Sequence, residues 1–197
     1  MKIGKFAALL SRKYTTMLIK SLAVFCGSQS GRQQLFEQQA TKLGNWMAAK
    51  NIQLVYGGGN VGLMGAVANA VMNGGGTVTG VIPELLASRE RSHKNLTELL
   101  VVENMHIRKK KMYELSDAAV ILPGGYGTLD ELFEMITWNN LSIHDKNIYI
   151  INLNGFYDHL LAHINAMHEN GFLYENPMNR ITVVKDVEAL MALPDFD

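Results

Sequence analysis

Cysteine is scarce in this chain, and neither charge sign is in excess. Cys26 is the single cysteine among 197 residues, so no internal disulfide bond can form, and we expect a protein of a reducing, cytoplasmic compartment. The 18 Lys and Arg residues balance the 18 Asp and Glu residues, which disfavours a nucleic-acid binder that depends on a large basic field. No apolar run approaches the roughly 20 residues that a membrane-spanning helix needs. We therefore expect neither nucleic acid nor a membrane as a partner.

Metal-binding patterns and charged residues are also few. The six histidines are scattered, and no His or Cys cluster has the spacing of metal ligands, so we expect no metal. Charged residues make up 18% of the chain, against roughly 25% in an average soluble protein. This low fraction suggests that a partner covers part of the surface.

Apolar residues, by contrast, are plentiful. They make up 48% of the chain, which is enough for one domain with its own hydrophobic core, expected over residues 20–197. Residues 1–19 carry several cations and no acid. We expect a disordered basic extension there, with a short amphipathic surface helix as the alternative.

Short apolar runs, many of them β-branched, alternate with segments of helical periodicity. Runs of this composition are typical of parallel strands covered on both faces. The expected strands are 21–25, 53–56, 77–82, 99–102, 118–122, 148–153 and 180–184. The expected helices are 32–50, 62–73, 105–115, 128–140, 156–170 and 186–193. This alternation predicts an α/β fold, a Rossmann-like, doubly wound parallel sheet in three layers.

Three unusual loops follow expected strands, at residues 26–31, 57–62 and 123–128. Each places glycines or hydroxyls between a strand end and a helix start, where free N–H groups and the helix dipole can hold an anion. Because parallel strands end at the same edge of a sheet, we expect the three loops to lie together. The sequence therefore predicts a phosphate site at this edge.

One of these loops also fits a dinucleotide pattern. Gly57, Gly59 and Gly62 match G-x-G-x-x-G. The pattern follows the second expected strand instead of the first, and the acidic residue about 20 positions on is Glu84, directly after Pro83. We therefore do not expect NAD. Glycines that permit a tight turn and close packing explain the pattern, and a mononucleotide site is the alternative.

The loop at 123–128 leads into an acidic helix start. Thr128-x-x-Glu131 can be a capping box, with Thr128 as N-cap and Glu131 bonding back, which is a purely structural role. An apolar stripe is expected to pack on the sheet: Leu129, Leu132, Phe133 and Ile136. Glu131 lies on a different face of the helix and can point into a ligand cleft. From the residues, both roles of Glu131 stay open.

Four consecutive cations begin at Arg108, on an expected helix. Helical spacing puts Arg108 and Lys109 on one stripe with Met105 and Met112, whereas the next two lysines turn toward solvent. A guanidinium in a partly covered position needs an anionic partner, because an unpaired charge out of water costs several kcal/mol. A ligand phosphate and Glu131 are the two candidates.

Several motifs of this sequence occur together in one known family. They are Cys26-Gly27-Ser28, Tyr56-Gly57-Gly58-Gly59-x-x-Gly62-Leu63-Met64-Gly65, Gly80-Val81-Ile82-Pro83, Met105-His106-x-Arg108-Lys109 and Pro123-Gly124-Gly125-x-Gly127-Thr128-x-x-Glu131. On these motifs the chain from about Ser21 to Leu193 resembles the Lonely Guy (LOG) family of phosphoribohydrolases. Such enzymes cleave the N-glycosidic bond of AMP or of N6-substituted AMP, the cytokinin ribotides. The resemblance implies the same hydrolase activity here, without a cofactor.

The resemblance also implies roles for individual residues. Arg108 and Glu131 would be the catalytic pair. Further contacts to the substrate, mostly around its phosphate and ribose, would come from Ser28, Glu90, Lys109, Gly125, Tyr126, Gly127, Thr128 and Thr137. Members of the family form homodimers with active sites near the subunit contact, so we expect a homodimer.

Two other functions fit part of the pattern. A non-catalytic carrier or sensor would bind a nucleotide with the same loops and release no free base. An amino-acid decarboxylase, a label that members of the family often carry, would need pyridoxal phosphate on a lysine with an acidic partner for the ring nitrogen. No residue pair in the sequence suggests that arrangement.

Overall fold

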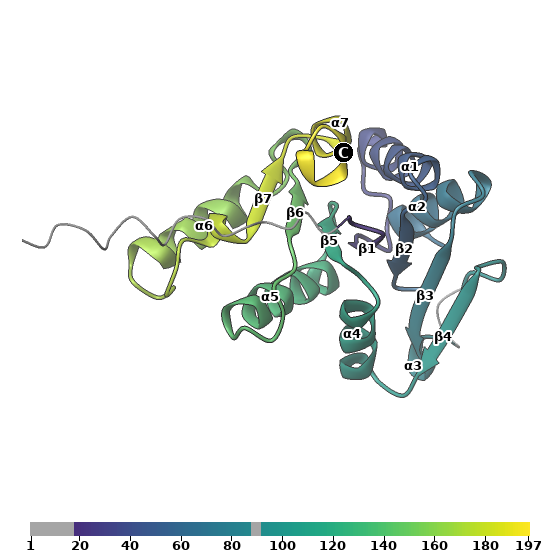
Figure 1. Cartoon of the computed structure of the whole chain (residues 1–197), viewed down its shortest axis with the longest axis horizontal. Coiled ribbons are helices and arrows are strands. Elements are labelled where there is room, and N and C mark those ends of the chain that lie inside the picture. Colours follow the sequence, from purple (N-terminus) through teal and green to yellow (C-terminus); the bar gives the residue numbers. More distant parts are fainter. Residues whose placement is uncertain (1–17, 88–91) are drawn as a thin grey trace, which may run out of the picture.

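The computed structural model describes residues 18–87 and 92–197, so the expectation for residues 1–19 lies almost wholly outside the described residues. Its middle layer is a seven-stranded sheet in the order β4-β3-β2-β1-β5-β6-β7, and every neighbouring pair is parallel (Figure 1). The strands are β1 (Ser21–Phe25), β2 (Gln53–Tyr56), β3 (Val78–Pro83), β4 (Glu98–Val102), β5 (Ala118–Ile121), β6 (Ile148–Ile151) and β7 (Ile181–Val184).

Helices follow the strands along the chain. They are α1 (Gln34–Ala49), α2 (Gly62–Asn73), α3 (Glu84–Ala87), α4 (Met105–Glu114), α5 (Tyr126–Asn140), α6 (Asp158–Glu169) and α7 (Val187–Met191). Short 3-10 turns lie at Leu153–Gly155, Pro177–Asn179 and Pro194–Phe196. Every expected strand and helix is present, with bounds that differ by at most two residues at either end, and only the short α3 was not expected. The predicted α/β fold is confirmed. None of the helices in the described ranges is both long enough and apolar enough to cross a bilayer.

Two hydrophobic clusters, one on each face of the sheet, form the core. On one face α1, α2 and α7 pack against the sheet, and on the other α4, α5 and α6 do so (Figure 1). The central strands β1, β5 and β6 are buried at every position. Burial on both faces explains why these strands are continuous apolar runs instead of alternating ones.

The order of the strands creates a crevice between β1 and β5. The chain first builds outward from β1 to β4 and then returns to place β5 on the other side of β1. The connections that leave β1 and β5 therefore depart to opposite faces of the sheet, and ligands bind at such a reversal point. The loops that follow Phe25 and Ile121 flank this crevice.

The buried face of α5 differs from the predicted apolar stripe. Leu132 is fully buried, but Leu129 and Ile136 are only partly buried against the core. The residues that α5 does bury are Thr128, Glu131, Leu132, Met135 and Asn139. The polar members of this face have specific partners or border the crevice, so the hydrophobic pattern alone identified the inner face incompletely.

Candidate active site

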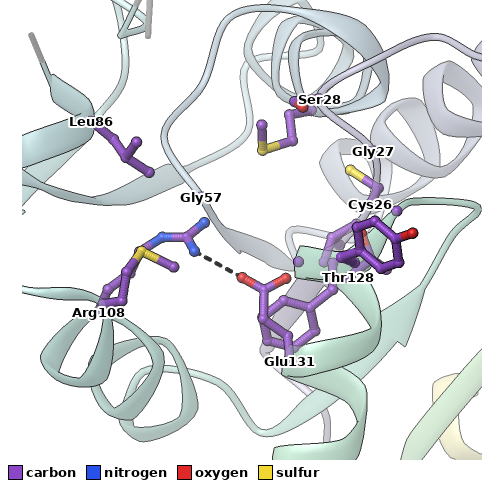
Figure 2. A pocket seen from close by; sticks show the side chains of 15 residues that line it. Cys26, Gly27, Ser28, Gly57, Leu86, Arg108, Thr128 and Glu131 are labelled. Carbon is purple, nitrogen blue, oxygen red and sulfur yellow. Dashed lines mark hydrogen bonds and ion pairs between the residues drawn. The ribbon is translucent and has the colours of Figure 1, made fainter. Parts of the chain in front are cut away.

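A cavity of about 350 Å³ lies in the crevice at the carboxyl ends of β1 and β5. This volume is in the range of small-molecule sites. Its lining comes from the loop after β1, from Gly57, from α3 and α4, and from the start of α5 (Figure 2). The lining residues include Cys26, Gly27, Ser28, Gly57, Met64, Leu86, Met105, Arg108, Gly125, Tyr126, Gly127, Thr128 and Glu131.

Arg108 reaches the cavity from the first turn of α4. The helix is capped by Asn104, whose side-chain oxygen accepts a hydrogen bond from the amide of Ile107 at 3.0 Å. The guanidinium donates from Nε to the carbonyl of Val81 at 3.0 Å and from Nη1 to Oε1 of Glu131 at 2.9 Å. Arg108 is only 8% exposed. The prediction that this guanidinium has an anionic partner is confirmed, and of the two candidates Glu131 is the one in contact (Figure 2).

At two glycines of the G-x-G-x-x-G pattern, other atoms of the protein lie so close to the backbone that a side chain would collide with them. A methyl group at position 57 would lie 2.2 Å from Nη2 of Arg108, so only glycine leaves room for the guanidinium there. Gly62 has a φ of +60°, and a Cβ there would lie 2.4 Å from the backbone carbon of Ser28. These contacts support the packing interpretation, and Gly57 adds space for a site residue.

Glu131 lies in the second turn of α5, so of the two roles that the sequence left open for it, the capping box is excluded. The helix begins at Tyr126 with Gly125 as N-cap, so Thr128 is already inside the first turn. Glu131 is therefore not near enough to the true helix start to bond back to an N-cap; its carboxylate is bonded to Arg108 instead. The side chain is 6% exposed and still borders the cavity (Figure 2).

Burial controls the titration of this carboxyl group. Desolvation raises the pKa of Glu131 from 4.5 to about 7, although the neighbouring Arg108 acts to lower it. A carboxyl group that titrates near neutral pH is suited to proton transfer. Burial, with a smaller contribution from Glu131, also raises the pKa of the Cys26 thiol. Cys26 therefore lines the cavity as a neutral thiol and is not a thiolate nucleophile.

The start of α5 offers backbone donors to an anion. The first amides of a helix have no intrahelical acceptor, and the N-cap Gly125 supplies no side-chain oxygen. Gly125, Tyr126, Gly127 and Thr128 all border the cavity. The positive end of the helix dipole adds to the attraction for a negative group. A phosphate can therefore be held here, next to the Arg108–Glu131 pair.

Lys109 does not border the cavity, although the resemblance implied a contact with the nucleotide. Its Nζ lies 3.0 Å from a carboxylate oxygen of Asp130 and 2.9 Å from one of Glu134. The side chain is 13% exposed. The following lysines are on the solvent side, at 62% and 43% exposure, and contact only Glu114 among the ion pairs of the described chain. The prediction that they turn away is confirmed.

The other predicted site residues divide into two groups. Ser28 and Tyr126 border the cavity, and Tyr126 is 94% exposed at its rim. Thr137 is exposed, is not part of the lining, and donates its hydroxyl to the carbonyl of Phe133 at 2.7 Å. Glu90 lies outside the described residues.

Tyr113 is a site-supporting residue that the sequence analysis missed. Its hydroxyl lies 3.0 Å from the backbone oxygen of Glu131 and 3.2 Å from a carboxylate oxygen of Glu134. Its ring packs edge-on against Trp138 with the ring centroids 4.7 Å apart. A signal was present, because Tyr113 follows Lys109 by four residues and so shares its helix face.

A second, more apolar cavity of about 270 Å³ adjoins the first. The two share Gly27, Ser28 and Gly125, and the second is also lined by Phe36 and Phe156. The crevice thus has two adjoining parts. The polar part contains Glu131, and the apolar part contains Phe36 and Phe156. Within residues 18–87 and 92–197, no group of three or more His, Cys, Asp or Glu side chains could hold a metal ion.

Comparison with known proteins places this arrangement in a family. The chain is 46% identical over 174 residues, 88% of each protein, to a cytokinin riboside 5′-monophosphate phosphoribohydrolase of Rhodococcoides fascians. It is 47% identical over 154 residues to the enzyme LOG3 of Arabidopsis thaliana, covering 78% of this chain and 72% of the relative. The family profile described as "Possible lysine decarboxylase" matches residues 64–193. This chain belongs to the LOG family.

One further relative and one more distant solved structure are similar to this chain. A probable phosphoribohydrolase of rice, LOGL2, is 49% identical over 154 residues, and the match spans 78% of this LOG-family chain and 63% of the rice protein. The molybdenum cofactor binding protein of Rippkaea orientalis has a solved structure that superposes with a TM-score of 0.67 at 18% identity, covering 89% of this chain and 94% of that one. At this identity the likeness shows the shared fold alone.

Proposed function

We propose that this LOG-family chain is a phosphoribohydrolase that cleaves the N-glycosidic bond of AMP or of N6-substituted AMP (a cytokinin ribotide). The products are the free base and ribose 5-phosphate. The observation that carries the proposal is the Arg108–Glu131 pair, joined at 2.9 Å, on the wall of a cavity that also contains the helix start of α5. The relatives' own names, cytokinin riboside 5′-monophosphate phosphoribohydrolase, support it.

Glu131 supplies the charge that the reaction needs. Breaking a bond between ribose and a base passes through a sugar with oxocarbenium character, as in glycoside hydrolysis. The carboxylate of Glu131 stabilises this developing positive charge and orients the attacking water. The water oxygen bonds to the anomeric carbon as the glycosidic C–N bond breaks, and the electron pair of that bond leaves with the base. One water proton passes to Glu131, the base takes up a proton from solvent, and Glu131 then returns its proton to solvent. The pKa of Glu131, raised by burial to about 7, lets it accept that proton and release it again.

Arg108 acts by position and charge. A guanidinium does not lose its proton in proteins, so Arg108 is not the acid that protonates the base. Its Nη1 orients the carboxylate of Glu131 and acts to lower the pKa of that group, opposing the larger effect of burial. A second hydrogen bond, to the carbonyl of Val81, fixes the guanidinium itself.

The 5′-phosphate is the anchor in this proposal. The amides at residues 125–128 hold it at the start of α5, with the hydroxyl of Thr128 as a further donor. Binding energy from this remote group is then used to orient the ribose against Glu131. Ser28 and Tyr126, on the cavity rim, are placed to contact the rest of the nucleotide.

We further propose that the protein is a homodimer. Large apolar side chains are exposed at the end of α5 and in the turn after it, with Leu141 at 65% and Ile143 at 61% exposure. Leu129 and Ile136 on the same helix are only partly buried. Clustered apolar exposure of this kind marks a contact with another protein. Sedimentation equilibrium of the purified chain tests it, with the mass of a monomer as the contrary result.

The central experiment is a chromatographic screen of nucleoside monophosphates with the purified protein. We expect release of adenine, or of an N6-substituted adenine, together with an equal amount of ribose 5-phosphate. A nucleotide carrier would instead bind AMP stoichiometrically and release no base on long incubation. An amino-acid decarboxylase would show the absorbance of a pyridoxal Schiff base, but no lysine is among the described residues that line the cavity.

A further inference from the structure

The connection between β5 and α5, residues 122–125, leads directly into the helix start that borders the cavity. Its backbone is tied to β1 and to the loop after β1. The amide of Leu122 donates to the carbonyl of Phe25 at 3.0 Å, and the amide of Gly27 donates to the carbonyl of Pro123 at 3.0 Å. Leu122 is fully buried, so its own carbonyl also needs a partner inside the protein.

Tyr157 supplies this partner from the turn after β6. Its hydroxyl donates to the carbonyl of Leu122 at 2.7 Å. The backbone of Gly124 is hydrogen-bonded to the same hydroxyl. Burial raises the pKa of Tyr157, so the phenol keeps the proton that it donates. One buried hydroxyl therefore holds the backbone on both sides of Pro123, a residue that has no amide of its own to donate.

The Tyr157 side chain has a fixed position of its own. The amide of Tyr157 donates to Oδ1 of Asn152 at 2.7 Å, and Nδ2 of Asn152 donates to Oδ1 of Asp158 at 2.7 Å. The ring packs edge-on against Phe156, with the ring centroids 4.8 Å apart. Tyr157 is only 2% exposed. The hydroxyl is thus held at one place relative to β6, whether or not a ligand is present.

The connection is packed on its inner side and open on its cavity side. A methyl group at Gly124 would lie 2.1 Å from Oγ1 of Thr128, so this part of the backbone lies directly against the first turn of α5. At Gly125 and Gly127, by contrast, an added methyl group would meet no protein atom within 4 Å. A shift of the backbone at residues 122–124 would therefore move the amides that border the cavity.

We infer that Tyr157 is a positioning residue for phosphate recognition: its hydroxyl fixes the backbone at residues 122–124 and so places the amides at the start of α5. The inference rests on the proposed function, because it concerns the phosphate anchor of that site. Tyr157 is not among the residues that line either cavity, so it acts through the connection and not by touching the ligand. Hydrogen bonds from the amides to a phosphate weaken steeply when their angles change.

The test is Tyr157→Phe, which keeps the ring and removes the hydroxyl. We expect the dissociation constant of ribose 5-phosphate, measured by calorimetry, and KM for AMP to rise by about tenfold. For adenosine, which has no phosphate, kcat/KM should stay within about twofold of wild type. A merely structural role of Tyr157 would instead lower kcat/KM for both substrates alike.

Tyr149→Phe is the matched control. Tyr149 is also buried, and its hydroxyl lies 2.6 Å from a carboxylate oxygen of Asp195, outside both cavities. This variant should lose thermal stability to a similar extent as Tyr157→Phe, because each loses one buried hydrogen bond. Its affinity for ribose 5-phosphate and its KM for AMP should equal those of wild type.

Three results would overturn the inference. They are wild-type affinity for ribose 5-phosphate in Tyr157→Phe, an equal loss with AMP and adenosine, and the same weakening of binding in Tyr149→Phe. The proposed function fails separately, if wild-type protein releases no base from any nucleoside monophosphate. Calorimetry with ribose 5-phosphate needs no turnover, so it decides on Tyr157 in that case as well.

Discussion

The guanidinium of Arg108 on α4 and the carboxylate of Glu131 on α5 meet at 2.9 Å on the wall of a cavity about 350 Å³ in volume. Both side chains are almost fully buried, at 8% and 6% exposure, yet both border the space where a ligand would lie. An ion pair in this setting stabilises a fold poorly, because desolvation offsets most of the attraction. The position of this ion pair, where the strand order of the sheet reverses, is explained better by a role in catalysis than by a contribution to stability.

Replacing Glu131 by Gln should abolish most base release. The amide keeps the shape of the side chain but cannot carry the negative charge that stabilises the oxocarbenium-like sugar. Losing one such interaction in the transition state costs about 100- to 1000-fold in kcat. The measurement is chromatographic detection of free adenine from AMP, with circular dichroism to confirm that the variant is folded. Turnover equal to wild type by the folded variant would remove Glu131 from the mechanism.

The pH dependence of kcat/KM should follow the ionisation of Glu131. The pKa of this group is about 7 because burial disfavours the charged form, and the proposed mechanism needs the carboxylate. Below that pH, kcat/KM for AMP should therefore fall by about tenfold per pH unit. Initial rates from acidic to mildly alkaline buffers at constant ionic strength measure this. A profile that stays flat through neutral pH would contradict the assigned role.

The same pKa shift predicts the pH dependence of stability. The carboxyl of Glu131 titrates at 4.5 when exposed and at about 7 in the folded protein, so the folded state binds the extra proton between these values. The stabilising contribution of protonated Glu131 is complete below the lower value and is lost as the pH rises through the upper one. Glu131→Gln lacks this proton. From about pH 5 to about pH 8, urea denaturation should show wild type losing more unfolding free energy than the variant does.

Gly57→Ala should disable the site with little effect on the fold. The added methyl group would lie 2.2 Å from Nη2 of Arg108, so the guanidinium must shift from the position in which it bonds Glu131. We expect kcat/KM for AMP to drop by about 100-fold, because a small displacement of a catalytic group is sufficient for such a loss. Thermal unfolding should show a midpoint close to wild type. Full activity in this variant would mean that the position of the guanidinium is unimportant.

Adenosine should be a much poorer substrate than AMP. It lacks the phosphate that the amides at the start of α5 hold, and with it the binding energy that orients the ribose. We expect kcat/KM to be lower by at least about 100-fold, and we expect ribose 5-phosphate to inhibit competitively where ribose does not. The measurement is a comparison of initial rates of adenine release from both substrates. Equal rates would show that the 5′-phosphate does not contribute to orienting the ribose.

Local sequence was sufficient for the secondary structure. Strands such as Ser21–Phe25 and Ile148–Ile151 are short apolar runs, and in the helices between strands the apolar residues recur with a period of about 3.6 residues. The doubly wound sheet could therefore be predicted, with small errors only at the ends of its strands and helices. The start of α5 was predicted late because Gly125 and Tyr126 look like loop residues. Thr128 and Glu131 then looked like a capping box, whereas the helix had already begun at Tyr126.

The sequence by itself determined the order of elements, the glycine-rich loops at one edge and the identity of the two charged candidates, because these depend on patterns within a few residues. Only the tertiary structure decided which charges meet. Arg108 and Glu131 are 23 residues apart and touch because α4 and α5 pack on the same face of the sheet, while Lys109 is directed to Asp130 and Glu134 instead of to the cavity. Neighbours on one helix point in directions about 100° apart, so the packing of the second helix selects which of them enters the site.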